Sequence, residues 1–338
     1  MTPFSIFYDD DAQTEAWLNN DRLLALIRFD ESAAVHLDPR VTTVTLPELG
    51  GTATVEVWLS THPVQTGAIN GVQYADNGDT LFLQCMADEA APDALSVLTA
   101  TAYQRLFAVA RERGYRRLLR IWNYFPAINQ KVGDLERYRA FCVGRHWAFQ
   151  AERAELESHL PAASAIGATP SLLPLSGGKV RGGGLRLYAL VSRDAGVQIE
   201  NPRQISAFHY PRQYGPQSPS FSRAILKPWG PQAAHLYISG TASVVGHASQ
   251  HGDLMAQLDE TLMNLEALLA EAKQRVALPL KLALLRIYLR SDLDPTPLRI
   301  RIAQVFGAAV PLLFLRADIC RRELLIEIEG LATQDPAA

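Results

Sequence analysis

The sequence predicts an α/β protein of two halves, each a mixed β-sheet with helices packed on one face. Its 338 residues are enough for about two domains. Along the chain, short apolar segments typical of strands alternate with longer amphipathic segments of helical period, which predicts sheets covered by helices. Residues 161–184 are rich in Ala, Ser, Pro and Gly, and we expect them to link an N-terminal domain (1–160) to a C-terminal domain (185–338).

In the first half, the longest expected helix covers about 92–113. Leu98 and Leu106 lie on its apolar stripe, and Gly114 follows at a position suited to end it. A second helix is expected over 135–144. Strands are expected over 53–60, 80–86, 117–122 and 147–156. The first forty or so residues match no motif that predicts a role.

The second half repeats this order of elements. Its strongest helix covers 253–273, where Leu258, Leu262 and Leu265 share one face, and another is expected over 297–306. Strands are expected over 187–192, 235–240, 282–289, 312–319 and 323–330. Each half therefore follows roughly the order β-β-α-β-α-β(-β), a similarity of element order without a residue-level repeat.

The composition indicates an ordinary soluble protein. A net charge of −3 gives no electrostatic reason to expect nucleic acid as a partner. The sequence contains no apolar run of the roughly 18 residues that a membrane helix needs, and its N-terminus lacks the regions of a signal peptide. The three cysteines form no metal or disulfide pattern. We therefore expect a cytoplasmic, reduced protein without a membrane partner.

The last expected strand carries two carboxylates among apolar residues. In the run Ile326-Glu327-Ile328-Glu329, alternate side chains point to opposite faces, so Glu327 and Glu329 share one face. Such acids are either solvated charges at a sheet edge, the commoner case, or acids held in a pocket. Which of the two holds decides whether the protein is a catalyst.

Motifs in both halves resemble known families. In the second half, segments in the order typical of the RidA/YjgF family of small α/β domains occur at 214–216, 221–224, 238–240, 253–265 and 327–329. The chain from about 50 to 330 resembles the chorismatase family through the segments 122–124, 128–129, 138–145, 210–216 and 318–322. The nearest type is the 3-/4-hydroxybenzoate synthase associated with the xanthomonadin pigment. The resemblance implies two RidA/YjgF-like (chorismate-mutase-like) domains.

The resemblance also implies an activity. Chorismatases act on chorismate without metal or cofactor, in a site between the two halves, and release the enolpyruvyl side chain as pyruvate. The ring leaves as a dihydroxy-cyclohexadiene carboxylate or, after loss of water, as a hydroxybenzoate. We expect 3-hydroxybenzoate here, with 4-hydroxybenzoate as an open second product. A monomer is implied, because the two domains of one chain mimic an interface that RidA-like trimers form between subunits.

The residue that the resemblance implies as general acid is Glu327. It would protonate the enolpyruvyl methylene, which leaves an oxocarbenium-like centre open to attack by a hydroxyl or water. Near pH 7 this role needs a raised pKa, and burial among Leu325, Ile326 and Ile328 could supply it. Glu329 is the second choice, because the matched motif places the functional carboxylate first.

Two small residues are implied beside this acid. In chorismatases a cysteine seven positions before the acid goes with the benzoate-forming type, and Cys320 has that spacing. Its thiolate would trap or steer a ring intermediate, with Arg321 or Arg322 lowering its pKa, although a lone cysteine is otherwise a small core residue. Gly240 would leave room beside the ring.

The two carboxylates of chorismate call for cations, and the planar fork of arginine suits them. The candidates are Arg139, Arg145, Arg212, Arg223 and Arg316, of which we favour Arg145 and Arg223. Donors to ring or ether oxygens would be Asn123, Tyr124, Tyr138 and Tyr214, each of which could equally be a packing residue.

Three other functions compete with this prediction. The hydrolytic branch of the family gives the non-aromatic diol, and Cys320 argues against it. A RidA-like imine deaminase needs an arginine in the penultimate strand, where this chain has Phe314. A ligand-binding or scaffold protein would be favoured by a solvent-facing Glu327 and opposed by a buried one.

Overall fold

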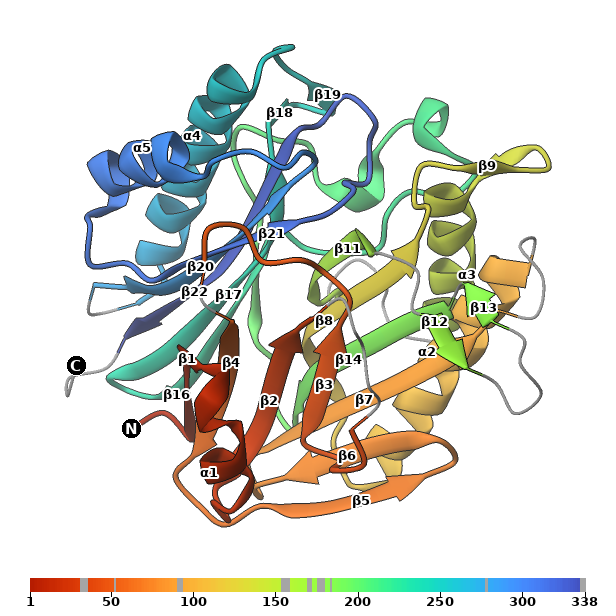
Figure 1. The fold of residues 1–338 in the computed structure, drawn as a ribbon, viewed down its shortest axis with the longest axis vertical. Coiled ribbons are helices and arrows are strands. Elements are labelled where there is room, and N and C mark those ends of the chain that lie inside the picture. The colour runs from red at the N-terminus through yellow and green to blue at the C-terminus, as the bar shows by residue number, and fades with distance from the viewer. Residues whose placement is uncertain are drawn as a thin grey trace.

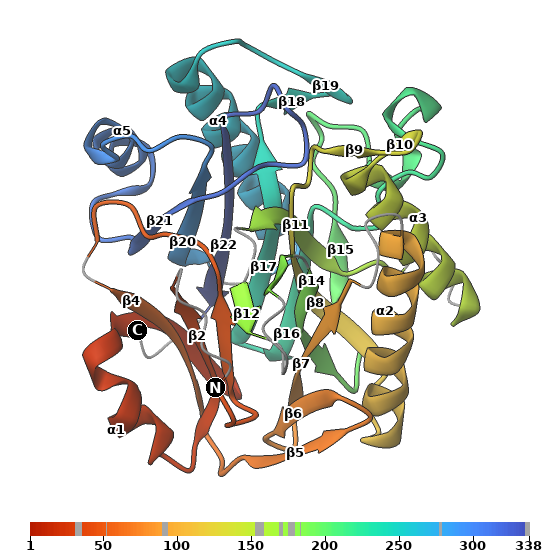
Figure 2. The same ribbon diagram turned by 45° about the vertical axis from the view of Figure 1, so that its right-hand side comes forward.

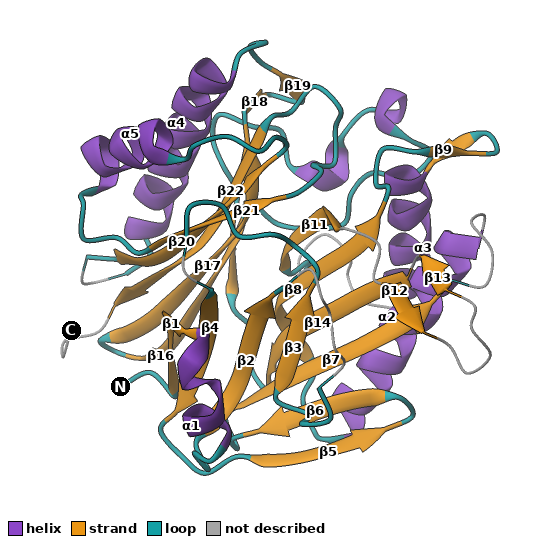
Figure 3. Cartoon of the chain, in the orientation of Figure 1, coloured by secondary structure: helices purple, strands orange, loops and turns teal. Residues whose placement is uncertain are grey.

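Two large mixed sheets face each other in the centre of the molecule, with helices on the two outer sides (Figures 1 and 2). The computed structural model describes residues 1–30, 36–51, 53–89, 94–152, 159–168, 172–174, 180–182, 184–276 and 279–334. The predicted α/β class is confirmed, since each large sheet carries its helices on one face (Figure 3). Within these residues, no helix is long and apolar enough to cross a membrane.

The first large sheet has the order β11-β8-β14-β7-β6-β5. Its strands are β5 (Gln65–Ile69), β6 (Val72–Asp76), β7 (Thr80–Asp88), β8 (Arg117–Pro126), β11 (Ala162–Ala168) and β14 (Gly184–Ser192). Helices α2 (Leu95–Glu112) and α3 (Arg137–Ala151) pack on one face through a core that includes Leu106 and Phe141. Gly114, at φ +82°, follows the end of α2 in the left-handed conformation that glycine adopts easily.

The second large sheet has the order β15-β16-β17-β22-β20-β21. Its strands are β15 (Val197–Ile199), β16 (Ala224–Gly230), β17 (Ala233–Ala242), β20 (Lys281–Leu289), β21 (Leu312–Arg316) and β22 (Ile326–Gln334). Helices α4 (Leu254–Lys273) and α5 (Thr296–Phe306) cover one face. The carboxylate of Asp253 caps α4 by accepting a hydrogen bond from the Ala256 amide, at 2.9 Å.

A third sheet was not predicted. It has the order β1-β4-β2-β3, from β1 (Phe4–Asp10), β2 (Leu23–Phe29), β3 (Val41–Val44) and β4 (Thr54–Ser60). Strands β2 and β3 are buried almost throughout, so they lack the polar alternation by which a half-exposed strand is recognised. This sheet closes the open end between the two large ones (Figure 2).

The remaining elements are short. They are η1 (Asp11–Gln13), α1 (Thr14–Leu18), η3 (Ala207–His209) and η4 (Arg212–Tyr214), and the strand pairs β9 (Lys131–Val132) with β10 (Leu135–Glu136), β12 (Leu172–Pro174) with β13 (Val180–Gly182), and β18 (Val244–Val245) with β19 (Ala248–Ser249). Three of them, η4, β10 and β18, lie near the cavity described below.

Several predicted elements are corrected. The strand expected over 147–156 is wrong for its first five residues, because α3 continues to Ala151 and buries Ala148 and Phe149. Residues 153–158 lie outside the described part of the chain. The expected connection 161–184 contains β11, and much of the rest of it lies outside the described residues. The strand expected at 187–192 belongs to β14, which pairs with β7 and β8 in the first sheet rather than opening the second. Residues 320–325 form a loop, and β22 begins at Ile326.

Strand β11 is the seam between the halves. It pairs in parallel with β8 and also bridges to the second half, where Gly167 exchanges backbone hydrogen bonds with Asp318 at 2.8 and 3.0 Å. The hydroxyl of Ser239 on β17 accepts from the Ala163 amide at 2.8 Å. Because this strand is composed largely of Ala, Ser and Gly, the two sheets approach each other closely at this place.

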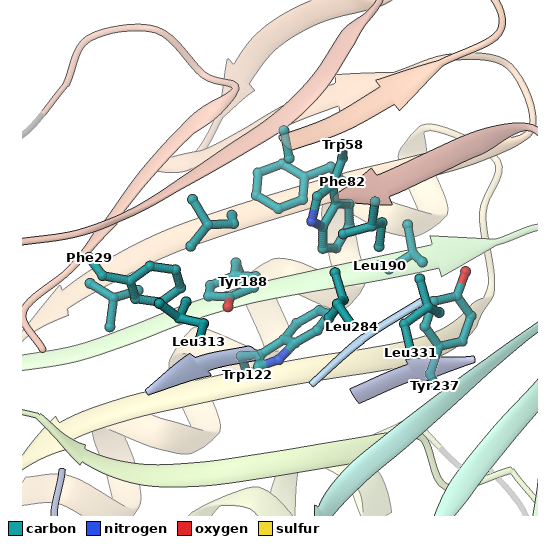
Figure 4. Close-up of a cluster of buried hydrophobic side chains, with 14 of the residues drawn as sticks. Phe29, Trp58, Phe82, Trp122, Tyr188, Leu190, Tyr237, Leu284, Leu313 and Leu331 are labelled. Atoms are coloured by element: carbon teal, nitrogen blue, oxygen red, sulfur yellow. The ribbon is translucent and has the colours of Figure 1, made fainter. Parts of the chain in front are cut away.

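A shared apolar core lies between the three sheets (Figure 4). Trp58 comes from the small sheet, Trp122 and Tyr188 from the first large sheet, and Tyr237 and Leu284 from the second. Trp122 and Tyr188 stack with ring centroids 4.6 Å apart. The two large sheets are therefore joined by this core as well as by the seam.

Candidate active site

One cavity at the seam collects most of the residues that the sequence singled out. Its volume is about 260 Å³. The predicted site residues that line it are Glu327, Cys320, Gly240, Arg223, Tyr214, Arg139 and Tyr138. They come from both halves of the chain, since Tyr138 and Arg139 lie on α3 and the others follow residue 200. The cavity thus lies between the halves.

Glu327 is the buried acid of this cavity. Its neighbours in β22, Ile326 and Ile328, point into the core under α4, which turns Glu327 to the opposite face. The side chain is 4% exposed. Burial, and secondarily the negative charge of Glu329, raises the pKa of Glu327 to about 8, against the smaller opposing effect of Arg120 and Arg223. At neutral pH the group is therefore mostly a protonated carboxylic acid.

Gly240 lies directly against this acid. The pairing of β17 with β22 shifts register between Ile238 and Thr241, so Gly240 sits in a β-bulge. A Cβ atom at Gly240 would meet Oε1 of Glu327 at 1.9 Å. The space that a glycine leaves here is occupied by the carboxyl group of Glu327 itself, whereas we had expected it to serve the substrate ring.

Glu329 does not line the cavity. Its carboxylate accepts hydrogen bonds from Arg120 (2.7 Å), Trp122 (2.8 Å), Arg286 (2.9 Å), Tyr288 (3.0 Å) and the hydroxyl of Ser164. Two of these contacts are ion pairs, with Arg120 and Arg286. Of the two carboxyl groups on this strand, Glu327 is therefore the one that faces the cavity.

Cys320 is a neutral thiol rather than the expected thiolate. Burial, and then the charge of Glu327, raises the pKa of the Cys320 thiol well above its usual range, and Arg321 opposes this only in part. Arg321 stacks on Tyr214 instead, with its guanidinium 4.2 Å from the ring centroid, and Arg322 donates to the carbonyl of Asn129. The thiol lies 4.0 Å from Oε2 of Glu327, within reach of a weak hydrogen bond.

Two of the five candidate arginines line the cavity. Arg223 is buried, and its Nη2 donates to the hydroxyl of Tyr210 (2.7 Å) and the carbonyl of Ile205 (2.9 Å), while its Nε has no hydrogen-bond partner among the described residues. Arg139 projects from α3, its side-chain stem packing close to Gly215. An unpartnered buried nitrogen and a second guanidinium give the cavity a positive character that suits an anionic ligand.

Three predicted binding residues lie elsewhere. Arg145 is buried among the rings of Tyr103, Phe141 and Phe149 and donates to the carbonyl of Ser220 at 2.6 Å, so it packs α3 rather than facing the cavity. The amide of Asn123 accepts from Tyr103 and donates to the Ser164 carbonyl. The Tyr124 hydroxyl contacts those of Tyr188 and Tyr288.

The other two arginines also lie apart from the cavity lining. Arg212 is exposed on η4, and Arg316 pairs with Asp292 at 2.6 Å. A sequence reports which arginines exist but not which way each points, so Arg145 could not be separated from Arg139 in advance.

Sequence reasoning missed several lining residues. Besides Arg321 and Arg322, considered only for their effect on Cys320, these include Gln204, Tyr210, Gln213, Gln217 and Glu136. Tyr210 and Gln213 lie in the segment 210–216, whose resemblance to the family motif is the signal that could have indicated them together with Tyr214. The hydroxyl of Tyr214 contacts Nδ1 of His247 at 3.1 Å, which joins this segment to the loop after β18.

A larger hollow of about 460 Å³ lies between α2, α3 and the start of β8. Among the described residues that line it, the one carboxylate, Glu152, is paired with Arg111. It therefore offers no acid comparable to Glu327. Nor do the described residues contain a cluster of three or more His, Cys, Asp or Glu side chains arranged to hold a metal ion.

Comparisons with known proteins agree on one family. A family model described as "Chorismatase FkbO/Hyg5-like, N-terminal" matches residues 56–175. A 3-hydroxybenzoate synthase of Streptomyces hygroscopicus is 35% identical over 82% of this chain and 80% of its own length, and a chorismatase of Streptomyces rapamycinicus is 36% identical over 82% and 81%. A crystal structure of a chorismatase is 30% identical, covers 98% of each chain and superimposes with a TM-score of 0.82.

Proposed function

The chain belongs to the chorismatase family, and on that premise we propose that it converts chorismate to pyruvate and a hydroxybenzoate, with 3-hydroxybenzoate as the main aromatic product. The observation that carries the proposal is a buried, protonated Glu327 in a cavity that also presents Arg139 and Arg223. Carboxylate recognition and proton donation are the two tasks that chorismate sets, and this cavity has groups for both.

Binding comes first in this proposal. Chorismate carries one carboxylate on the ring and one on the enolpyruvyl group. Arg139 on α3 and Arg223 before β16 project from the two halves of the chain, so each carboxylate can meet its own guanidinium. In this proposed arrangement the ether link of the substrate lies across the seam, beside Glu327.

Proton transfer follows. Glu327 donates its proton to the methylene carbon of the enolpyruvyl group, and the ether-bearing carbon becomes an oxocarbenium-like centre. Pyruvate and a hydroxybenzoate together contain all the atoms of chorismate, so the aromatic branch consumes no net water. The diol branch takes up one water molecule. A buried carboxylic acid suits this step, because its proton is held at neutral pH until the substrate accepts it.

Cys320 is proposed to direct the ring toward aromatisation. Its thiol lies 4.0 Å from Oε2 of Glu327. Once Glu327 has delivered its proton it is a carboxylate, and the thiol proton then has an acceptor beside it. The thiolate so formed adds to the electrophilic ring that is left when the ether carbon–oxygen bond breaks and pyruvate departs. Loss of the neighbouring ring proton then expels the sulfur, which takes up a proton again, and the ring becomes aromatic. The thiol of Cys320 therefore does not have to be ionised before the substrate binds.

The competing functions are less favoured by the geometry. A binding or scaffold protein would leave Glu327 facing solvent, but the side chain is buried. An imine deaminase would need a cation in β21, where Phe314 instead belongs to the core under α4 and α5. The hydrolytic branch of the family remains the alternative that must be separated by experiment, because both branches begin with the same proton transfer.

The test is an incubation of the purified protein with chorismate, without added metal or cofactor. Pyruvate is assayed, and the ring products are separated by chromatography. Pyruvate with 3-hydroxybenzoate supports the proposal; pyruvate with the diol assigns the hydrolytic branch. Absence of pyruvate would instead favour a ligand-binding protein or an imine deaminase. Size-exclusion chromatography of the same sample tests the proposed monomer.

A further inference from the structure

We propose that Glu329 is a positioning residue for the reaction: together with Arg120 and Ser164 it fixes the place and the electrostatic surroundings of the Glu327 carboxyl group from outside the cavity. The inference rests on the proposed function in that it takes Glu327 as the acid. None of the three residues lines the cavity, and nothing in the comparisons assigns them a role.

Ser164 is the mechanical link. Its hydroxyl accepts from Nη2 of Arg120 at 2.7 Å and from the backbone amide of Gly240 at 3.0 Å, and it donates to Oε2 of Glu329. Gly240 is the bulge residue against which Oε1 of Glu327 rests. A chain of contacts therefore runs from Glu329 through Ser164 and Gly240 to the acid, and it ties β22, β11 and β17 together where the reacting group lies.

The electrostatic link is separate from the mechanical one. The groups that act on Glu327 are Glu329 on the same strand, Arg120 on β8, and Arg223 before β16, while Cys320 and Tyr138 face it from the loop before β22 and from α3. The negative charge of Glu329 favours the protonated form of Glu327, and the positive charge of Arg120 favours the ionised form. The Glu329–Arg120 pair therefore places opposing charges behind the acid.

A purely structural role is the competing explanation. Arg286 pairs with Glu329 at 2.9 Å and with Glu56 on β4 at 2.6 Å, so the same ions also join the small sheet to the two large ones. Breaking a buried ion pair is strongly destabilising wherever it lies. Loss of activity alone would not separate the two explanations, but the direction of a titration shift does.

The experiment compares Glu329→Gln with Arg120→Gln. In each folded variant, the titration of the Glu327 carboxyl is followed by carbon-13 NMR of the labelled protein without substrate, and kcat/KM for pyruvate release is measured against pH. Glu329→Gln should move both titrations to lower pH and Arg120→Gln to higher pH, each by about one unit. At pH values above the titration this is about a tenfold change in kcat/KM, a decrease in Glu329→Gln and an increase in Arg120→Gln.

Glu56→Gln is the matched control. It removes a charge from the same network, at the β4 end, and Glu56 is not among the groups that act on Glu327. In Glu56→Gln the titration of the Glu327 carboxyl should be unchanged even if Tm falls. Ser164→Ala keeps both charges but loses the tether to Gly240, and it should lower kcat with KM nearly unchanged and the pH profile in place.

Shifts in the same direction in Glu329→Gln and Arg120→Gln, or no shift in either, would overturn the inference. If both charge variants fail to fold, normal kcat in Ser164→Ala would overturn it. Because the NMR titration needs no substrate, it tests this inference even if the protein does not cleave chorismate. Failure of the proposed function, seen as wild-type protein without pyruvate release, is thereby distinguished from failure of this inference.

Discussion

Burial keeps Glu327 protonated at neutral pH, at a cost to the stability of the fold. A carboxyl whose pKa is raised on folding binds more protons in the native than in the unfolded state between its ordinary value and about 8. Over that window its contribution to the free energy of unfolding becomes less favourable as pH rises. A buried carboxyl with a raised pKa is typical of residues at functional sites.

The pH dependence of turnover follows from the same residue. Because the protonated form is the reactive one, kcat/KM, which reports the protein without substrate, should be highest below pH 8 and fall as pH rises through about 8, by about tenfold per unit beyond it. Steady-state pyruvate release between pH 6 and 10 checks this. A kcat/KM that rises through this range would show that the ionised form is the active one.

Gly240 should tolerate no side chain without cost to the reaction. In Gly240→Ala the new methyl group displaces the carboxyl of Glu327, which is the movable end of a side chain, so the fold should survive with little change in Tm. Misplacement of a reacting group by about 1 Å can cost on the order of a hundredfold in rate. We expect kcat to fall at least about tenfold. An unchanged kcat would place the acid elsewhere.

Cys320 should affect the product and not the first step. In Cys320→Ala pyruvate release should continue, because Glu327 still donates its proton, while the ring product should shift toward the diol or the other hydroxybenzoate isomer. Chromatography of the products measures the ratio. Cys320→Ser is the control that keeps the size and a weaker nucleophile. An unchanged mixture in Cys320→Ala would make the thiol a packing residue.

At the scale of elements, the long amphipathic helices were predicted well. The helix expected over 253–273 is α4, and that expected over 92–113 is α2, each within a few residues. Their apolar stripes follow directly from the sequence. Strands β2 and β3 were missed because both faces are buried. The expected end of the second helix at Gly144 is wrong, because this glycine lies inside α3 and allows it to pack closely against the backbone of Ser96.

The cap of α4 is predicted to stabilise the second half without touching the site. Asp253→Ala removes the acceptor for the Ala256 amide and should lower the free energy of unfolding by about 1 kcal/mol. Urea denaturation measures the change, and kcat should stay as in wild type. Glu266→Ala, at an exposed position of the same helix, is the control and should change stability by less than about 0.5 kcal/mol.

At the scale of the whole molecule, the site exists because two sheets meet along β11. The order of elements predicted the sheets and their helices but could not show that β14 joins the first sheet, since pairing partners are set by tertiary contacts. The same limit applies to side chains. Matched motifs indicated Glu327, Cys320 and Gly240. They could not show that Arg145, Asn123 and Tyr124 are held outside the cavity, because the buried partners of these residues lie on both faces of the folded sheet.

The proposed role of Glu327 as the proton donor in cleavage of chorismate can be tested in one comparison. Pyruvate release from chorismate is measured for the wild-type protein and for Glu327→Gln side by side at pH 7. We predict release by the wild type, and none above background by a variant whose Tm is no lower than that of the wild type. Pyruvate release by Glu327→Gln at near wild-type rate would show that Glu327 is not the donor.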